Sequence, residues 1–316
     1  MPTVRTLFIP VDDPGAMRLE GAIPPMVTPT EGREGGVDVT VLESYTEFLV
    51  EGGVHGLFPC GSIGEFPSLT REERRTVVET VVEAAGDVPV LAGCGATSVA
   101  DVVALTEDAA AAGASAAVVV TPYYLGVDQA GLRGFYEAVA DRSPLPVVLY
   151  NIPQRTGVTL EVATTVALAD HENVVGVKDS SGGMAGLFRT VEETPEEFAV
   201  VQGLSMLALP SLDSGAAGLI SGAANVFPAA LSALYEAHRA GEYDRAVAIS
   251  NEIAGPLVTA YADLPTAAAL KHLVGHAGHE VGPPVLPLSE LGAEDRRSLS
   301  ERYDRVRERA EAHSLV

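Results

Sequence analysis

The sequence predicts an α/β protein, a (β/α)8 TIM barrel followed by a C-terminal helical domain. Eight short apolar runs rich in Val, Ile and Leu alternate with eight longer segments of helical period. Near-continuous apolar strands are typical of a parallel sheet covered on both faces. Eight βα units within residues 20–240 match the size of such a barrel. A doubly wound sheet would usually carry G-x-G-x-x-G after its first strand, where Pro24–Pro29 stands here, so we expect the barrel.

The elements follow from apolar period and from cap residues. The expected strands are Ala22–Val27, Gly56–Pro59, Val88–Gly93, Ala116–Thr121, Pro146–Asn151, Val174–Lys178, Ala199–Gly203 and Gly218–Ser221. The expected helices are residues 38–52, 71–85, 98–112, 128–141, 159–170, 183–193, 205–214 and 228–239. Thr70 begins a capping-box pattern, and Ser98 and Asp128 are suited to cap the helices that follow them. Gly113 and Gly215 stand where helices should end.

The chain is expected to have three parts. Residues 1–19 match no repeat and read as an N-terminal extension, and residues 20–240 form the barrel. Strand signals disappear after residue 240. Residues 241–276 read as helical, Pro283–Pro287 as a loop and 293–313 as a charged helix, so 241–316 is expected to be a smaller helical domain packed on the barrel.

Composition excludes several classes of protein. A net charge of −23 argues against binding to nucleic acid or to anionic membranes. Such acidity with very little lysine is typical of proteins adapted to a salty cytoplasm, the alternative being an ordinary acidic protein. Cys60 and Cys94 lack CxxC spacing and predict neither disulfide nor zinc. No signal peptide and no apolar run of membrane-spanning length is evident, so we expect a soluble cytoplasmic protein.

One lysine stands directly after an apolar strand, in the run from Val174 to Gly182. Lys178 and Lys271 are the only lysines, so 18 of the 20 basic residues are arginine (20 − 2). A guanidinium stays protonated, whereas a desolvated ammonium can lose its proton and become a nucleophile. Lys178 therefore predicts a Schiff-base lysine. The alternative is a strand-end lysine in a salt bridge with Asp179.

Other polar residues follow successive strands, where barrel active sites form. The second strand is followed by Gly61–Glu65, the fourth ends in Thr121–Tyr124, and the fifth runs into Tyr150–Gly157. Tyrosine can transfer protons, a Gly-rich turn offers N–H groups to a carboxylate, and an arginine can hold an anion. Each group also has a structural alternative. The tyrosines could be core residues, the Gly-rich turn could be a plain turn whose glutamate accepts backbone N–H bonds, and the arginine could belong to an ion pair. Their joint placement favours imine catalysis.

These motifs resemble the N-acetylneuraminate lyase and dihydrodipicolinate synthase superfamily of class I, pyruvate-dependent aldolases. The shared patterns are G-[ST]-x-G-E, T-P-Y-Y, Y-N-x-P-x-R-T-G and G-x-K-[DE], found as Gly61–Glu65, Thr121–Tyr124, Tyr150–Gly157 and Gly176–Asp179. The resemblance extends over about residues 21–299. It implies a barrel with a C-terminal helical domain, a homotetramer built as a dimer of dimers, and no metal or organic cofactor.

The resemblance also assigns roles to residues. Lys178 is the imine lysine and Tyr150 the general acid and base, with Ser62 and Tyr124 relaying protons to Tyr150. The residue matching Tyr124 comes from a neighbouring subunit in the family. The remaining matches are to substrate-binding positions, namely Arg155, Gly203 and Ile220. Arg155 matches an arginine that binds the carboxylate of the aldehyde substrate in the synthases.

One position departs from the family and bears on the substrate. Ile63 stands where a threonine commonly helps to bind the carboxylate of pyruvate. This change and the surrounding residues favour an aldolase or lyase acting on a 2-oxo-3-deoxy sugar acid such as 2-keto-3-deoxygluconate. The alternatives are 4-hydroxy-tetrahydrodipicolinate synthase, which joins pyruvate to aspartate semialdehyde, a 2-oxo-3-deoxy acid dehydratase, and a non-catalytic barrel that binds a 2-oxo acid.

Two further groups are expected to be structural. His272, His276 and His279 read as one side of a C-terminal helix, but the glutamate of H-E-x-x-H is missing, so we expect no metal site. Cys94 has no histidine or basic neighbour in the sequence that would lower its pKa, so we expect a packed thiol.

Overall fold

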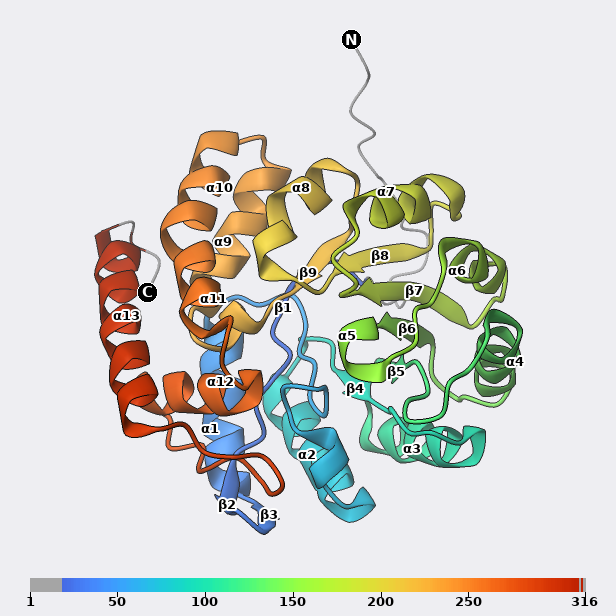
Figure 1. Ribbon diagram of the computed structural model, residues 1–316, viewed down its shortest axis with the longest axis horizontal. Coiled ribbons are helices and arrows are strands. Elements are labelled where there is room, and N and C mark those ends of the chain that lie inside the picture. The colour runs from blue at the N-terminus through green and yellow to red at the C-terminus, as the bar shows by residue number, and fades with distance from the viewer. Residues whose placement is uncertain (1–18, 313, 315–316) are drawn as a thin grey trace.

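A computed structural model describes residues 19–312 and 314, and seven of its strands form one curled parallel sheet (Figure 1). The barrel strands are β1 (Gly21–Ile23), β4 (Leu91–Gly93), β5 (Ala116–Val120), β6 (Val147–Asn151), β7 (Val174–Asp179), β8 (Ala199–Gln202) and β9 (Gly218–Ile220). Their order in the sheet is β1-β9-β8-β7-β6-β5-β4. The expected N-terminal extension lies outside the described residues, apart from Leu19.

The predicted second strand closes the sheet without forming a regular ladder. Leu57 forms a parallel bridge with Val90, and Phe58 forms one with Pro25. Phe58 N–H donates to the Pro24 carbonyl at 3.0 Å, and Leu57 N–H donates to the Pro89 carbonyl at 2.9 Å. Prolines have no N–H to donate, which explains why this seam consists of single bridges. The predicted (β/α)8 barrel is therefore confirmed, with a shorter first strand and third strand than expected.

Helices surround the barrel in the predicted order. They are α1 (Val39–Glu51), α2 (Arg71–Ala85), α3 (Val99–Ala112), α4 (Gln129–Ala140), α5 (Pro153–Thr156), α6 (Val162–Ala169), α7 (Met184–Glu193), α8 (Ala208–Asp213) and α9 (Pro228–Arg239). Short 3₁₀ turns are η1 (Phe66–Ser68), η2 (Ser205–Leu207) and η3 (Gly222–Asn225). The predicted caps are confirmed: Thr70 forms a capping box with Glu73, and Ser98 and Asp128 accept backbone N–H bonds.

Helices make up the C-terminal region, which lies to one side of the barrel in Figure 1. They are α10 (Tyr243–Ile249), α11 (Gly255–Tyr261), α12 (Thr266–His276) and α13 (Ala293–Ala312), with a π-helical turn, η4 (Ser250–Ala254), between the first two. A hairpin of β2 (Thr30–Gly32) and β3 (Gly35–Val37) was not expected. It joins the barrel to this region, because Thr30 N–H donates to the Val281 carbonyl at 3.1 Å.

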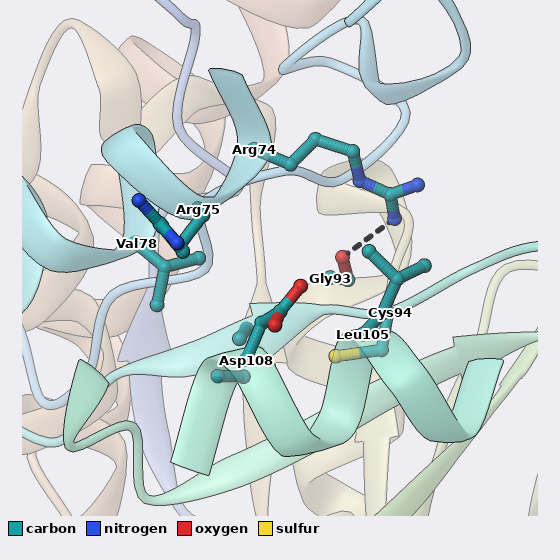
Figure 2. A pocket seen from close by; sticks show the side chains of 9 residues that line it. Arg74, Arg75, Val78, Gly93, Cys94, Leu105 and Asp108 are labelled. Carbon is teal, nitrogen blue, oxygen red and sulfur yellow. Dashed lines mark hydrogen bonds between the residues drawn. The ribbon is translucent and has the colours of Figure 1, made fainter. Parts of the chain in front are cut away.

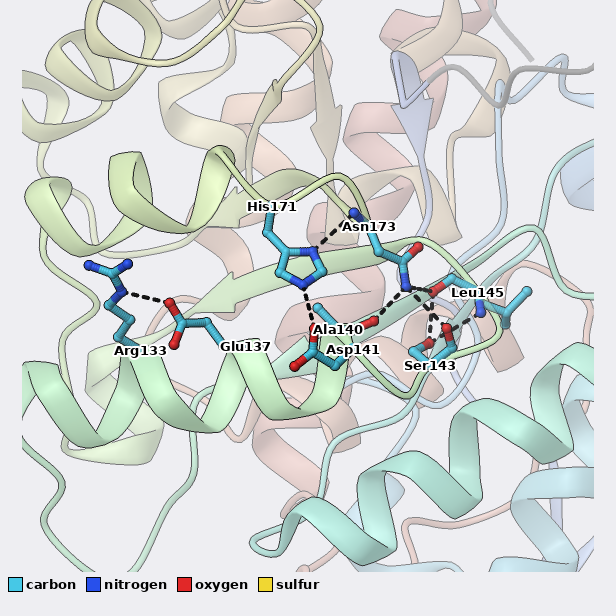
Figure 3. A network of polar contacts seen from close by, with 8 residues as sticks. All are labelled: Arg133, Glu137, Ala140, Asp141, Ser143, Leu145, His171 and Asn173. Atoms are coloured by element: carbon cyan, nitrogen blue, oxygen red, sulfur yellow. Dashed lines mark hydrogen bonds and ion pairs between the residues drawn. The ribbon is translucent and has the colours of Figure 1, made fainter.

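Asn173 fastens two loops that precede β6 and β7 (Figure 3). Its Nδ2 donates to the carbonyls of Ala140, Ser143 and Leu145 at 2.9, 3.1 and 3.2 Å. Its backbone N–H donates to Nδ1 of His171 at 3.1 Å. These loops lie at the amino ends of the strands, the end of a barrel that serves stability.

Candidate active site

Lys178 and Tyr150 lie side by side at the carboxyl ends of β7 and β6. The two residues are paired in the parallel register. Lys178 is 4% exposed, and its Nζ lies 4.0 Å from the centre of the Tyr150 ring and 4.8 Å from the centre of the Phe58 ring. Aromatic faces attract a cation but do not replace the water that solvates it. The amine is therefore enclosed in a largely apolar site.

Burial shifts the pKa of Lys178 towards the neutral amine. Desolvation lowers this pKa, and the positive charge of Arg155 lowers it further, against the opposing charge and hydrogen bond of Tyr150. A lowered lysine pKa increases the fraction of neutral amine at a given pH, and the neutral amine is the nucleophile.

Asp179 is not the ion-pair partner of Lys178. Its carboxylate accepts from Asn151 Nδ2 and from the N–H and Oγ of Ser181, each at 3.0 Å. Burial raises the pKa of Asp179, although these bonds oppose the rise. Among the ion pairs of the described residues, none involves Lys178, so the salt-bridge alternative for this lysine is wrong.

Two serine hydroxyls meet the phenol of Tyr150. Burial would raise the pKa of Tyr150, but the charge of Lys178 and hydrogen bonds with Ser62, Lys178 and Ser180 outweigh it, so the pKa is lowered. Ser62 was predicted and Ser180 was not. Ser180 lies two residues after Lys178, and the period-2 geometry of a strand would have placed both on one face. Phe58 was missed because an apolar residue in a strand carries no chemical signal.

Gly203 and Ile220, two of the predicted substrate-binding residues, lie at the ends of β8 and β9 and contribute shape without a polar side chain. A Cβ on Gly203 would lie 1.9 Å from Oγ of Ser180, so only glycine leaves room for that hydroxyl. Ile220 is fully buried in β9, paired with Ile23. Ile63 packs beside Gly222, where an added Cβ would lie 3.3 Å from Ile63 Cδ1.

Arg155 and Tyr124 are the two predicted residues that face outwards. Arg155 lies in α5 and is exposed, and its Nη2 donates to Oγ1 of Thr266 at 3.3 Å. It remains near enough to affect the pKa of Lys178. Tyr124 has φ 78° and is 94% exposed, so it does not join the buried Tyr150 of its own chain.

Comparison with known proteins decides the family. The chain matches the Dihydrodipicolinate synthetase family over residues 18–304. It is 42% identical over 275 residues to a 4-hydroxy-tetrahydrodipicolinate synthase of Methanoculleus marisnigri, covering 86% of this chain and 94% of the relative. The chain belongs to the dihydrodipicolinate synthetase family. This membership confirms the resemblance and the expected enzyme class, a class I carbon–carbon lyase.

Two other members of the family are similar. An uncharacterized DapA-like lyase of Halobacterium salinarum is 40% identical over 282 residues, with 89% of this chain and 92% of the relative covered. A prophage protein of E. coli K12 from the same family, solved with pyruvate, is 30% identical with a TM-score of 0.87. The alignment covers 92% of this chain and 99% of that one. The shared fold agrees with the barrel described above.

The C-terminal histidines of this family member join two helices. Nε2 of His272 contacts Ser300 Oγ and the Arg296 carbonyl, both at 3.0 Å, and His276 pairs with Asp304 at 3.0 Å. His279 lies beyond the end of α12, with its ring 4.5 Å from that of Phe48, so the expectation of one shared helix side was wrong for it.

A small cavity between β4, α2 and α3 lies next to the Cys94 thiol (Figure 2). Its volume is about 10 Å³, room for at most one water. Arg74 does lie near Cys94, contrary to the sequence expectation, and donates to the carbonyls of Gly93 and Gly95 at 2.9 and 3.1 Å. Burial outweighs this positive charge and raises the pKa of Cys94 to about 12, so the thiol is inert as predicted.

Among the described residues, no helix combines the length and the apolar character needed to cross a bilayer.

Proposed function

We propose that the chain is a class I aldolase in which Lys178 forms an imine with the 2-oxo group of its substrate. The observation that carries this proposal is the buried amine of Lys178 beside the Tyr150 ring, with a lowered pKa and no carboxylate partner among the described residues. A structural lysine at this depth would normally be paired, because an unpaired buried charge is costly.

The chemistry follows from these groups. Nζ of neutral Lys178 attacks the C2 carbonyl, water leaves, and a protonated imine results. Loss of a proton from the C4 hydroxyl then lets the C3–C4 bond break, with its electron pair moving to the imine to give an enamine and an aldehyde. Protonation of C3 and hydrolysis release pyruvate and restore the amine. Tyr150, supported by Ser62 and Ser180, is suited to exchange these protons.

We assign a 2-oxo-3-deoxy sugar acid as the preferred substrate. Ile63 supports this choice, because it offers no side-chain hydrogen bond to the carboxylate of pyruvate. The rest of the substrate must then supply more of the binding energy, and a polyhydroxylated chain has more groups to contribute. Exposed Arg155 and the loop of residues 180–183 are the polar groups proposed to meet it.

A second candidate is 4-hydroxy-tetrahydrodipicolinate synthase. It is favoured by the name of the Methanoculleus relative at 42% identity. A panel of purified reactions separates the two: pyruvate release from six-carbon 2-oxo-3-deoxy acids, and condensation of pyruvate with aspartate semialdehyde. We expect a clearly higher kcat/KM for sugar-acid cleavage, and efficient condensation without cleavage would reverse the ranking.

Reductive trapping tests the imine itself. Borohydride added with pyruvate should inactivate the enzyme irreversibly and leave a mass adduct on the peptide that contains Lys178. Lys271 is the internal control, because it is the only other lysine. An adduct on Lys271, or no adduct on active protein, would contradict the mechanism, whereas a silent binding barrel would show neither turnover nor an adduct.

Assembly is proposed from the family resemblance. A homotetramer built as a dimer of dimers would let Tyr124, 94% exposed in its own chain, reach the site of a neighbouring copy. Light scattering gives the mass of the assembly. Mixed assemblies of Tyr124→Ala and Lys178→Ala chains should regain part of the activity, whereas no regain would show that each chain uses its own groups.

A further inference from the structure

The second lysine of the chain forms a buried ion pair with the Gly61–Glu65 turn. Nζ of Lys271, on α12, lies 2.8 Å from Oε1 of Glu65. The side chains are 1% and 0% exposed, respectively. A chain that otherwise uses arginine for its basic residues has thus placed both of its lysines in the interior.

This pair joins four segments at one point. Nζ of Lys271 also donates to Oγ1 of Thr30 at 2.9 Å and to the Pro283 carbonyl at 2.8 Å. Oε2 of Glu65 accepts from the N–H of Val285 at 2.7 Å. The ammonium therefore has two hydrogen-bond acceptors and one ion-pair partner, a set that the planar five-donor fork of arginine does not match. The geometry explains why this position carries lysine.

The pair holds a strained turn that carries active-site residues. Glu65 has φ 57°, a left-handed conformation that is costly for a residue other than glycine and needs support from its surroundings. The same turn presents Ser62 to the hydroxyl of Tyr150. Leu270, next to Lys271, also approaches Gly222 as closely as Ile63 does, with Cδ1 3.3 Å from an added Cβ. The C-terminal region therefore contacts the turn through Lys271 and the segment after β9 through Leu270.

We propose that Lys271 is a positioning residue for the active site, acting through Glu65 to fix the turn that orients Ser62 and the backbone N–H groups meeting the substrate carboxylate. This inference rests on the proposed imine function of Lys178. A purely stabilising role is a poor explanation of the pair, because buried ion pairs are seldom better for stability than apolar residues of similar volume.

The test removes both charges at nearly constant volume. The double variant Glu65→Gln/Lys271→Met keeps an acceptor for Val285 and leaves no uncompensated charge. It should fold, and trapping by borohydride at saturating pyruvate should still label Lys178. The pyruvate concentration for half-maximal trapping should rise roughly tenfold or more, on the scale of lost hydrogen bonds to a charged group. Thr30→Val, which removes one acceptor of Lys271, should raise it roughly two- to tenfold, and keeps the test open if the double variant does not fold.

A matched control separates positioning from stability. Arg33 fixes the same C-terminal loop to the hairpin, since its Nη2 donates to the Leu288 carbonyl at 2.7 Å, but it does not touch Glu65. Arg33→Gln should lower the melting temperature without changing the half-maximal pyruvate concentration. If the Lys271 variants behave like this control, with half-maximal pyruvate concentrations within twofold of the wild type, Lys271 is only structural. If the wild type itself gives no Lys178 adduct, the proposed function fails, and the positioning role with it.

Discussion

At the scale of single residues, we expect proton transfer to depend on the Tyr150 hydroxyl. Tyr150→Phe keeps the ring against Lys178 and removes the proton carrier, so kcat should fall by ~10²–10⁴-fold while pyruvate trapping at saturation persists. Steady-state kinetics and trapping measure the two effects. Tyr235→Phe is the matched control, a buried tyrosine on α9 whose hydroxyl accepts from Nη1 of Arg239 at 3.5 Å. Near-full turnover by the Tyr150 variant would assign the proton to another group.

The pH dependence of trapping reports the pKa of Lys178. The rate should rise with pH as the amine loses its proton, and the lowered pKa moves this rise below the range of a free lysine. The charge of Arg155 lowers that pKa, so Arg155→Gln should move the profile to higher pH. Arg133→Gln, which changes an exposed arginine on α4 paired with Glu137, should leave it in place. A profile that stays or moves to lower pH in the Arg155 variant contradicts the assignment.

We expect Ile63 to determine how much of the binding energy comes from pyruvate alone. Ile63→Thr adds a hydroxyl to the turn and should lower the pyruvate concentration for half-maximal trapping by roughly tenfold or more, since a bond to a charged group contributes about 1.5–3 kcal/mol. The preference for sugar acids over aspartate semialdehyde should narrow. Ile63→Val has the shape of threonine without the hydroxyl. If valine tightens pyruvate binding as much as threonine does, the effect is steric.

Residues that face each other across strand ends could be predicted, whereas long-range packing partners could not. Lys178, Tyr150 and Ser62 carried chemical signals at strand ends, and the structure brings them together. The pairing of Glu65 with Lys271 joins positions 206 residues apart (271 − 65) and leaves no local pattern. The role proposed for exposed Tyr124 rests on the proposed assembly, and no pattern within one chain describes how copies of the chain would meet.

At the scale of helices and strands, apolar period and cap residues predicted the barrel well. Where a predicted strand did not form a regular ladder, neighbouring prolines are the reason. The eight strand positions were correct, but Gly56–Pro59 pairs only through single bridges because its neighbours include prolines. The β2–β3 hairpin was missed because its strands are short and rich in glycine, without the β-branched alternation that marks a strand.

We expect the Asn173 network to contribute to stability and not to activity. Asn173→Ala leaves three backbone carbonyls without their amide donor, so the free energy of unfolding should fall by about 1–3 kcal/mol. Because this network lies at the amino ends of the strands, kcat of the folded variant should equal that of the wild type. Chemical denaturation and kinetics measure both quantities. The exposed Asn251→Ala is the control, and a loss of kcat on replacing Asn173 would show that the two ends of the barrel are coupled.

At the scale of the whole molecule, the surface carries an excess of acidic residues that no exposed lysine offsets. Both lysines are buried, and the chain has 43 acidic residues against 20 basic ones. Several arginines pair with a glutamate one helical turn away, as Arg75 does with Glu79 and Arg189 with Glu193. Such exposed pairs contribute little to stability, so they leave most of the repulsion among carboxylates in place.

We therefore expect stability and activity to require molar salt. The Debye length is ~30 Å at 0.01 M and ~3 Å at 1 M, so salt should screen the repulsion between neighbouring carboxylates and raise the melting temperature steadily over this range. Replacing the exposed Glu43, Glu47 and Glu83 by glutamine should make the dependence shallower, because fewer like charges need screening. Replacing Arg75, Arg133 and Arg189 by glutamine should make it steeper, because their glutamates lose a partner. Opposite responses of the two triple variants would identify charge repulsion as the cause. A melting temperature that ignores salt, or two variants that respond alike, would mean that the acidity has another origin.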